Sequence, residues 1–178
     1  PLLINELKAL TKALRDPAKP LVAIVGGSKV STKLTILETL SDKVDQLIVG
    51  GGIANTFLKA DGYEIGQSLC EDDLVEVAAR LMKQAEEKGF EIPLPTDVIC
   101  GKTFDAETSA EIKSVKDVAA DDLILDVGPE TSRLFGAMLT DAKTIVWNGP
   151  LGVFEFDKFS QGTANLANAI ANSDAFYI

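Results

Sequence analysis

The chain has 178 residues, 46% of them hydrophobic and 25% charged, a mixture typical of a single globular domain without a membrane span. Its 17 basic and 27 acidic side chains give a net charge of −10, which disfavours nucleic acid but permits a small phosphate ligand. Without histidine, and with Cys70 and Cys100 far apart, the sequence excludes Ser-His-Asp catalysis, Cys-His catalysis and zinc sites.

Segments of helical period alternate with short apolar runs along the chain. The runs are almost continuously apolar, as in strands that are covered on both faces of a parallel sheet. A polar stretch over 103–118 interrupts the alternation, and we expect a short antiparallel excursion around 112–115. In chain order we predict a helix over 3–14, a strand over 21–25, a helix over 31–40, a strand over 46–49, a helix over 74–88, strands over 97–100 and 123–126, a helix over 129–139, a strand over 144–147, a helix over 159–171 and a final strand over 175–178.

This order of elements predicts an α/β fold. We expect one Rossmann-like domain over 1–178 with three layers, in which a mostly parallel sheet carries helices on both faces. Glycine and polar residues gather where the strands end, and ligands bind at that edge of open α/β sheets.

Two lysines follow the first strand and its Gly26-Gly27-Ser28 turn. Lys29 and Lys33 are four positions apart, so they share a helix face if the helix has begun by Lys29. Like charges at this spacing repel each other, and the positive end of the helix dipole disfavours cations further. A bound polyanion removes both penalties, so we favour a phosphate site over two solvated lysines.

Glycines also follow the second strand. Gly50-Gly51-Gly52 permits close approach of a ligand or of another chain segment, and the sequence does not choose between them. The acidic run Glu71-Asp72-Asp73 is typical of a solvated face or of charges at a helix start. Asp126 ends a later strand and could cap a helix or contact a ligand; we favour the cap.

A shaped loop follows the strand over 144–147. Asn148 stands where its amide can face the crevice at the sheet edge, and Pro150 fixes the backbone between two glycines. Val153 and Phe154 offer apolar surface for a flat ring, although for Phe154 we favour a core position. Glu155 could accept hydrogen bonds from ribose hydroxyls.

Together these segments resemble the C-terminal, nucleotide-binding domain of the phosphoglycerate kinase family, most closely its bacterial members. The family's order and spacing hold for GGSKVSTK, IVGGGIANTFL, LDVGPET and IVWNGPLGVFE, over essentially the whole chain. The resemblance implies a glycolytic enzyme of two domains. It transfers a phosphoryl group between 1,3-bisphosphoglycerate and Mg-ADP, giving 3-phosphoglycerate and ATP.

The resemblance also implies roles for single residues. Lys29 would meet the transferring phosphoryl group and Lys33 the nucleotide phosphates, which makes these two the catalytic residues. Ile124 stands where many members have glycine beside the adenine. The other implied nucleotide-binding residues are Gly27, Ser28, Gly51, Gly52 and Leu69 around the adenosine, Asn148 near the phosphates, Pro150 and Val153 at the base, and Glu155 at the ribose.

Two parts of the family pattern have no counterpart in the chain. They are the N-terminal domain that binds 3-phosphoglycerate and a Gly-rich loop with an Asp-Thr pair, whose aspartate binds Mg²⁺ in the family. We therefore expect a cytoplasmic, monomeric fragment that binds ADP or ATP, holds about half of an active site, supplies no metal ligand and is inactive alone.

Two other classes of protein stay open at this point. A noncatalytic nucleotide-binding or scaffold module would share the same turns. A Rossmann-type oxidoreductase is disfavoured, because no GxGxxG follows a strand and no acidic residue ends the second strand.

Overall fold

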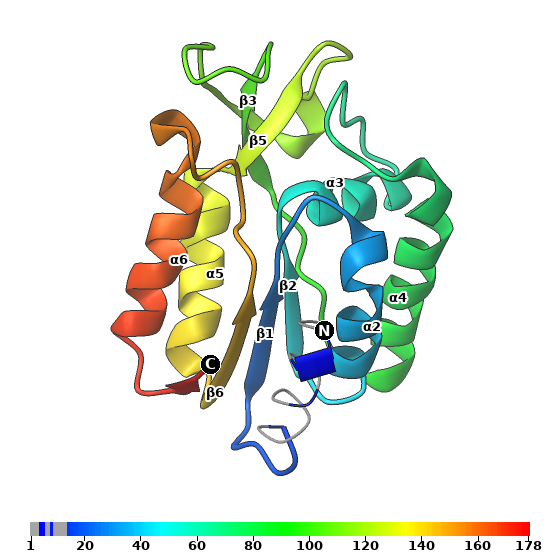
Figure 1. Cartoon of the computed structure of the whole chain (residues 1–178), viewed down its shortest axis with the longest axis vertical. Coiled ribbons are helices and arrows are strands. Elements are labelled where there is room, and N and C mark those ends of the chain that lie inside the picture. Colours follow the sequence, from blue (N-terminus) through cyan, green and yellow to red (C-terminus); the bar gives the residue numbers. More distant parts are fainter. Residues whose placement is uncertain (1–3, 6–7, 9–13) are drawn as a thin grey trace.

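The computed structural model describes residues 4–5, 8 and 14–178, so the helix predicted over 3–14 lies largely outside the described residues. At its centre is a parallel sheet of four strands, sheet A (Figure 1). In the order β2-β1-β6-β7, its strands are Gln46–Val49, Leu21–Val25, Thr144–Asn148 and Phe176–Tyr177.

The central strand of sheet A is β1. All five of its residues are fully buried, and Ile24 stands between Ile48 of β2 and Trp147 of β6. A continuously apolar strand fits this place because helices cover both faces of the sheet. The prediction of a three-layer α/β domain is confirmed.

Five helices of the described chain form the outer layers. Helices α2, α3 and α4 lie on one face of sheet A, and α5 and α6 lie on the other (Figure 1). No helix in the described part of the chain is long and apolar enough to cross a lipid bilayer. The bounds are Val30–Ser41 for α2, Gly51–Ala60 for α3, Val75–Lys88 for α4, Pro129–Asp141 for α5 and Gln161–Ala171 for α6.

The helix boundaries follow local signals. Pro129 opens α5, where its missing N–H has no helical partner to lose, and Gly89 ends α4 in the left-handed conformation with φ 81°. Helix α3 is not predicted from the sequence because its first turn contains Gly51 and Gly52, which are poor helix formers.

Each face of sheet A has its own apolar core. Phe57 of α3 and Leu81 of α4 pack on one face, and Phe135 of α5 and Leu166 of α6 pack on the other. These cores fix the strands, and the carboxyl ends of β1, β2 and β6 meet along one edge of the sheet (Figure 1).

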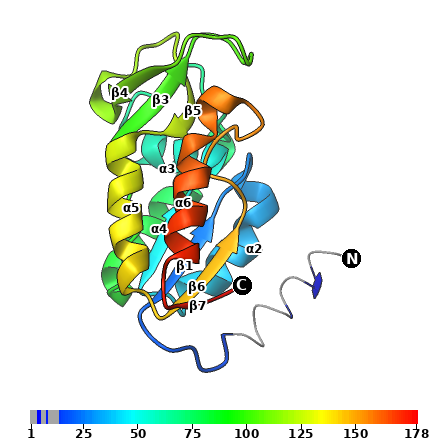
Figure 2. The ribbon, with the colours of Figure 1, turned by 90° about the vertical axis from the view of Figure 1, so that its left-hand side faces the viewer.

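A second sheet, sheet B, lies beyond that edge (Figure 2). Its strands run antiparallel in the order β4-β3-β5, with bounds Glu111–Ser114, Asp97–Gly101 and Leu123–Val127. The antiparallel excursion around 112–115 is confirmed by β4. The assignment of β3 and β5 to a parallel sheet is wrong, because an apolar run of four or five residues suits either kind of pairing.

Three short 3-10 helices complete the described chain. They are η1 (Asp72–Leu74), η2 (Val115–Asp117) and η3 (Asp157–Phe159). Helix η3 lies between β6 and α6 in the chain, and its residue Phe159 is fully buried.

Candidate functional site

A cavity of about 520 Å³ lies between the edge of sheet A and sheet B. The turn after β1, the first turn of α3, the loop after β6 and strand β5 all contribute to its walls. Segments that are far apart in the sequence therefore meet around one space. The predicted site residues that line it are Gly27, Ser28, Gly51, Gly52, Leu69, Pro150, Val153 and Glu155.

The glycines of this wall let one backbone segment approach another. Gly51 has a φ of 64°, and a Cβ there would lie 2.6 Å from the carbonyl oxygen of Gly27. A Cβ on Gly52 would overlap the carbonyl oxygen of Ser28. Of the two possibilities that the sequence leaves open for this turn, the structure supports close approach of another chain segment.

The loop after β6 is held against the same turn. The amide of Gly26 donates to the carbonyl of Asn148 at 2.7 Å, and the amide of Gly51 donates to the carbonyl of Leu151 at 3.0 Å. Gly149 has a φ of 96°, and any side chain there would collide with the backbone of Gly26. These contacts hold Pro150 at the cavity wall.

The two lysines do not share a helix face. Helix α2 begins at Val30, so Lys29 is its N-cap, with an extended backbone at φ −137°. The ammonium of Lys33 donates a hydrogen bond to the amide oxygen of Asn148. Within the described chain, no carboxylate forms a salt bridge with Lys29 or Lys33.

The side chain of Lys33 lies next to Gly27, at the cavity wall. Its Cε would be 3.7 Å from a Cβ on Gly27, and Gly27 is part of the cavity wall. The ammonium of Lys33 therefore lies at the sheet A end of the cavity, beside Asn148. A ligand that extends from the cavity past Gly27 would meet Lys33 first.

Glu71 is more than a solvated charge. Its carboxylate accepts a hydrogen bond from the amide of Ser31 at 2.9 Å, in the first turn of α2, and its own amide donates to Thr56 Oγ1 at 3.3 Å. Asn55 Nδ2 donates to the carbonyl of Leu69 at 3.1 Å. The segment that carries Leu69 is thereby fixed to both α2 and α3.

The sheet B end of the cavity is apolar and aromatic. Phe154 lines it and is 50% exposed, so the core position expected for this residue is wrong. The buried apolar side chains of this loop are instead Leu151 and Phe159. Ile124 joins this wall from β5.

Phe104 is a lining residue that the sequence did not reveal. It is 65% exposed and lies in the loop between β3 and β4. The only local signal is a single aromatic side chain in an otherwise polar stretch, which does not say what it faces.

Asp126 is a buried carboxyl group at the cavity wall. It is 2% exposed, and its two oxygens accept hydrogen bonds from the amides of Val127 and Gly162, each at 2.9 Å. Burial raises the pKa of Asp126 to about 6, because desolvation disfavours the charged form more than these bonds favour it. The expected capping role holds, but the capped helix is α6, far along the chain.

The donor set does not fit a resident metal ion. In the described part of the chain, no three His, Cys, Asp or Glu side chains gather closely enough to hold one. The site offers an apolar slot for a flat ring, a carboxylate at Glu155 and, beside Gly27, the ammonium group of Lys33. This arrangement can bind and orient a ring-bearing anion.

Comparison with known proteins points to one family. The family model described as Phosphoglycerate kinase matches residues 1–178. The chain is similar to the structure of phosphoglycerate kinase from Coxiella burnetii, with 55% identity and a TM-score of 0.93 over 99% of this chain and 46% of that one. It is also similar to phosphoglycerate kinase from Pyrococcus horikoshii OT3, with 27% identity and a TM-score of 0.79 over 98% of this chain and 45% of that one. The chain thus spans less than half the length of either.

Proposed function

The chain belongs to the phosphoglycerate kinase family, and we propose that it is the nucleotide-binding domain of such an enzyme. In this proposal it binds ADP and ATP for the reversible transfer of a phosphoryl group between 1,3-bisphosphoglycerate and ADP. The supporting observation is the cavity itself, where an apolar slot ends beside Lys33 and Asn148. Its shape and charge match a flat base at one end and phosphates at the other.

The two ends of the cavity would recognise different parts of the nucleotide. Ile124, Val153 and Leu69 provide the apolar surface that a base requires, and Glu155 would accept hydrogen bonds from the ribose hydroxyls. The ammonium of Lys33, which donates to Asn148 in this structure, would turn toward the phosphates and neutralise part of their charge. This exchange is favourable because an ammonium binds a phosphate more strongly than it binds an amide oxygen.

Phosphoryl transfer depends mainly on positioning and on charge neutralisation. Lys29 would stabilise the transferring group, and Lys33 would hold the nucleotide phosphates. The described residues hold no group of three His, Cys, Asp or Glu side chains around a metal ion, and no step is assigned here to Mg²⁺. A second domain would bring 3-phosphoglycerate, and holding donor and acceptor together is worth about 7–11 kcal/mol in well-oriented systems.

The proposal is tested at the phosphate end by Lys33→Ala. We expect the dissociation constant for ADP, measured by titration calorimetry, to rise about tenfold, the scale of one lost charge-assisted bond. Adenosine, which has no phosphate, should bind both proteins equally.

The matched control is Lys83→Ala, because Lys83 is exposed on α4 and its loss changes the net charge equally. An ADP affinity that Lys33→Ala leaves unchanged would reject the phosphate role. Failure of the parent protein to bind either ligand would reject the proposed function as a whole.

The ribose end is tested by Glu155→Gln in a double-mutant cycle. We expect about threefold weaker ADP binding, and little further loss when 2′-deoxy-ADP or 3′-deoxy-ADP replaces ADP, because both changes remove the same interaction. Additive losses would show that other groups bind the ribose.

A further inference from the structure

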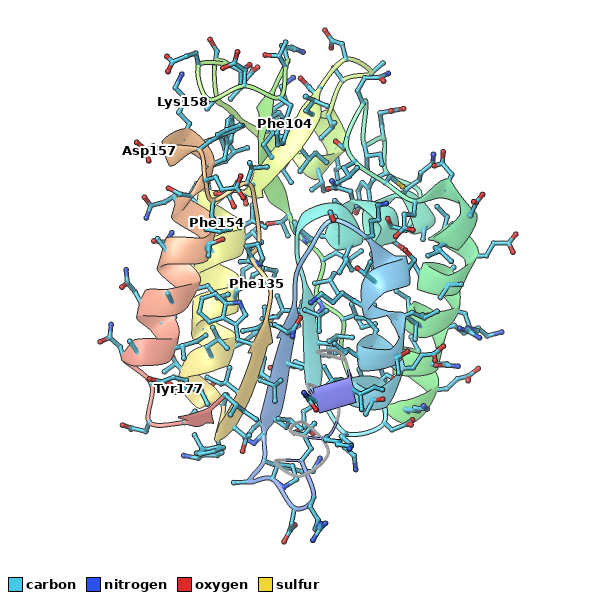
Figure 3. All side chains as sticks on the ribbon, viewed as in Figure 1. Phe104, Phe135, Phe154, Asp157, Lys158 and Tyr177 are labelled. Atoms are coloured by element: carbon cyan, nitrogen blue, oxygen red, sulfur yellow. The ribbon has the colours of Figure 1, made fainter. Side chains whose placement is uncertain are left out.

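Two loops form the aromatic rim of the cavity. Phe104 belongs to the loop between β3 and β4, at residues 102–110, and Phe154 belongs to the loop between β6 and α6, at residues 149–160. In Figure 3 both rings, together with Lys158, lie at the sheet B end of the molecule. About fifty positions separate the two loops in the sequence, so only tertiary contacts can hold one against the other.

The loop over 102–110 is folded on itself. Thr108 Oγ1 accepts the amides of Lys102 and Thr103 at 3.2 and 3.4 Å, and Asp105 Oδ1 accepts the amide of Glu107 at 2.9 Å. The side chain of Thr108 also packs beside Gly101. This internal order fixes the direction in which the loop presents its carbonyl groups.

The backbone of Lys158 is held in place on the other loop. It lies in η3, next to Phe159, which is fully buried. The lysine stem is long enough to leave this anchor and cross to the opposite loop.

The two loops meet at Lys158 and at one aromatic pair. Lys158 Nζ donates to the carbonyl oxygens of Glu107 and Thr108 at 3.3 and 3.0 Å. The rings of Phe104 and Phe156 lie 5.2 Å apart and are inclined by 56°, a favourable tilted arrangement. In the part of the chain that the structure describes, the two bonds from Lys158 are the only hydrogen bonds between these loops.

We propose that Lys158 and the Phe104–Phe156 pair form a clasp that holds the two loops together and sets how fast a bound adenine nucleotide leaves the cavity. The inference rests on the proposed nucleotide function. Phe104 is both a cavity wall and half of the aromatic pair, so movement of its loop changes the wall directly. Lys158 is a positioning residue in this scheme and does not touch the nucleotide.

The chemistry of the contact suits a clasp that opens. In the described chain Lys158 forms no salt bridge, although Asp157 is its neighbour, so its ammonium is directed at backbone carbonyls. Hydrogen bonds on an exposed surface exchange readily with water and contribute modestly to stability. Their loss should therefore change the rate of loop opening without unfolding the domain.

The decisive variant is Lys158→Met, which keeps most of the apolar stem and removes the donor. We expect displacement of a fluorescent ADP analogue, followed by stopped flow, to be roughly fivefold faster, the scale of one lost hydrogen bond. Lys158→Arg, which keeps a donor, should restore most of the slow release. Lys83→Met is the matched control and should leave the rate unchanged, because Lys83 is exposed on α4 and belongs to neither loop.

Phe156→Leu tests the aromatic half of the clasp, because it removes the ring but keeps an apolar side chain. We expect it also to accelerate release by a few-fold, with the thermal midpoint of the protein shifted little. An unchanged release rate in both Lys158→Met and Phe156→Leu would overturn the clasp.

A second comparison separates the clasp from a simple charge effect. A clasp acts on the base end, so Lys158→Met should accelerate the release of adenosine and of ADP by the same factor, and raised salt should not remove the effect. An acceleration that is confined to ADP and disappears at high salt would show long-range attraction of phosphate instead, and would overturn the clasp. If the parent protein bound no ADP, that result would reject the proposed nucleotide function, and the clasp would be rejected with it.

Discussion

The two sheets of this molecule are built from similar apolar runs but are stabilised differently. Sheet A lies between two helical layers, and β1 at its centre is fully buried. Sheet B has a small core and an open side, with Ile112 of β4 61% exposed. The difference shows that apolar burial secures the scaffold, whereas the part that closes the cavity depends on polar contacts.

A buried carboxylate, Asp122, supplies several of those polar contacts. Asp122 is 1% exposed and accepts hydrogen bonds from Lys102 Nζ at 2.6 Å, Lys113 Nζ at 2.7 Å and the amide of Ala119 at 2.7 Å. Although its burial opposes the charged form, the two lysines and the amide lower the pKa of Asp122 to about 2. The cluster joins β3, β4 and the start of β5.

The same residue connects sheet B to the cavity wall. The carbonyl of Asp122 accepts the amide of Gln67 at 2.7 Å, and Ser68 Oγ accepts the amide of Ile124 at 2.8 Å. The cavity-lining residues Gln67 and Ile124 therefore rest on this polar arrangement.

The largest effect should come from the core of sheet A. Phe57→Ala removes a fully buried ring, and we expect a loss of about 3–5 kcal/mol in the free energy of unfolding, measured with urea. Ile112→Ala in sheet B is the control and should cost about 0.5 kcal/mol or less, since its side chain is largely exposed. Equal losses would break the contrast between the sheets.

A smaller effect is expected from the polar cluster of sheet B. Asp122→Asn leaves two lysines without their carboxylate, and we expect a loss of about 1–3 kcal/mol. The loss should be concentrated in faster amide hydrogen exchange of β3 and β5. Asp121→Asn is the matched control, because its side chain is 75% exposed although it also contacts Lys102.

The pH dependence of the Asp122 effect has a definite sign. The pKa of this group is lower in the folded state than in the unfolded chain, so its stabilisation is present above about pH 4 and is lost as the pH falls toward 2. A difference between parent and Asp122→Asn that stayed constant over this range would contradict the ionic explanation.

The smallest effect should come from Asp126, and it has the opposite sign. Its pKa is about 6 in the folded state and near the usual 3.8 in the unfolded chain, so the folded protein binds the proton more tightly. Its contribution is greatest below pH 4 and falls as the pH rises through 6. Between pH 5 and 7 the parent should lose roughly 1 kcal/mol of stability relative to Asp126→Asn, in urea titrations at each pH. If the stability of the two proteins changed equally between pH 5 and 7, the raised pKa of Asp126 would be refuted.

The local elements of this protein are determined by its sequence. The stop at Gly89 and the start at Pro129 are signalled by neighbouring residues alone, because helix ends depend on the conformations that glycine and proline allow. The same holds for the buried strand β1 and for the short strand β4 within a polar stretch. The turn residues at Gly27, Gly51 and Pro150 could also be predicted as members of one site, through their motifs and the rule that strand ends meet at a sheet edge.

Only the tertiary structure decided which distant residues meet. β3 and β5 have the apolar pattern of parallel strands, yet they pair antiparallel in a separate sheet. Lys33 contacts Asn148 across 115 positions, Asp126 caps α6 across 36, and Phe104 reaches the cavity from a polar loop. The physical reason is that an apolar run predicts burial and a polar side chain predicts a hydrogen-bond partner, but neither pattern identifies the residues that it will contact. That choice is made when the whole chain packs, which is why the cavity wall is less predictable than the elements around it.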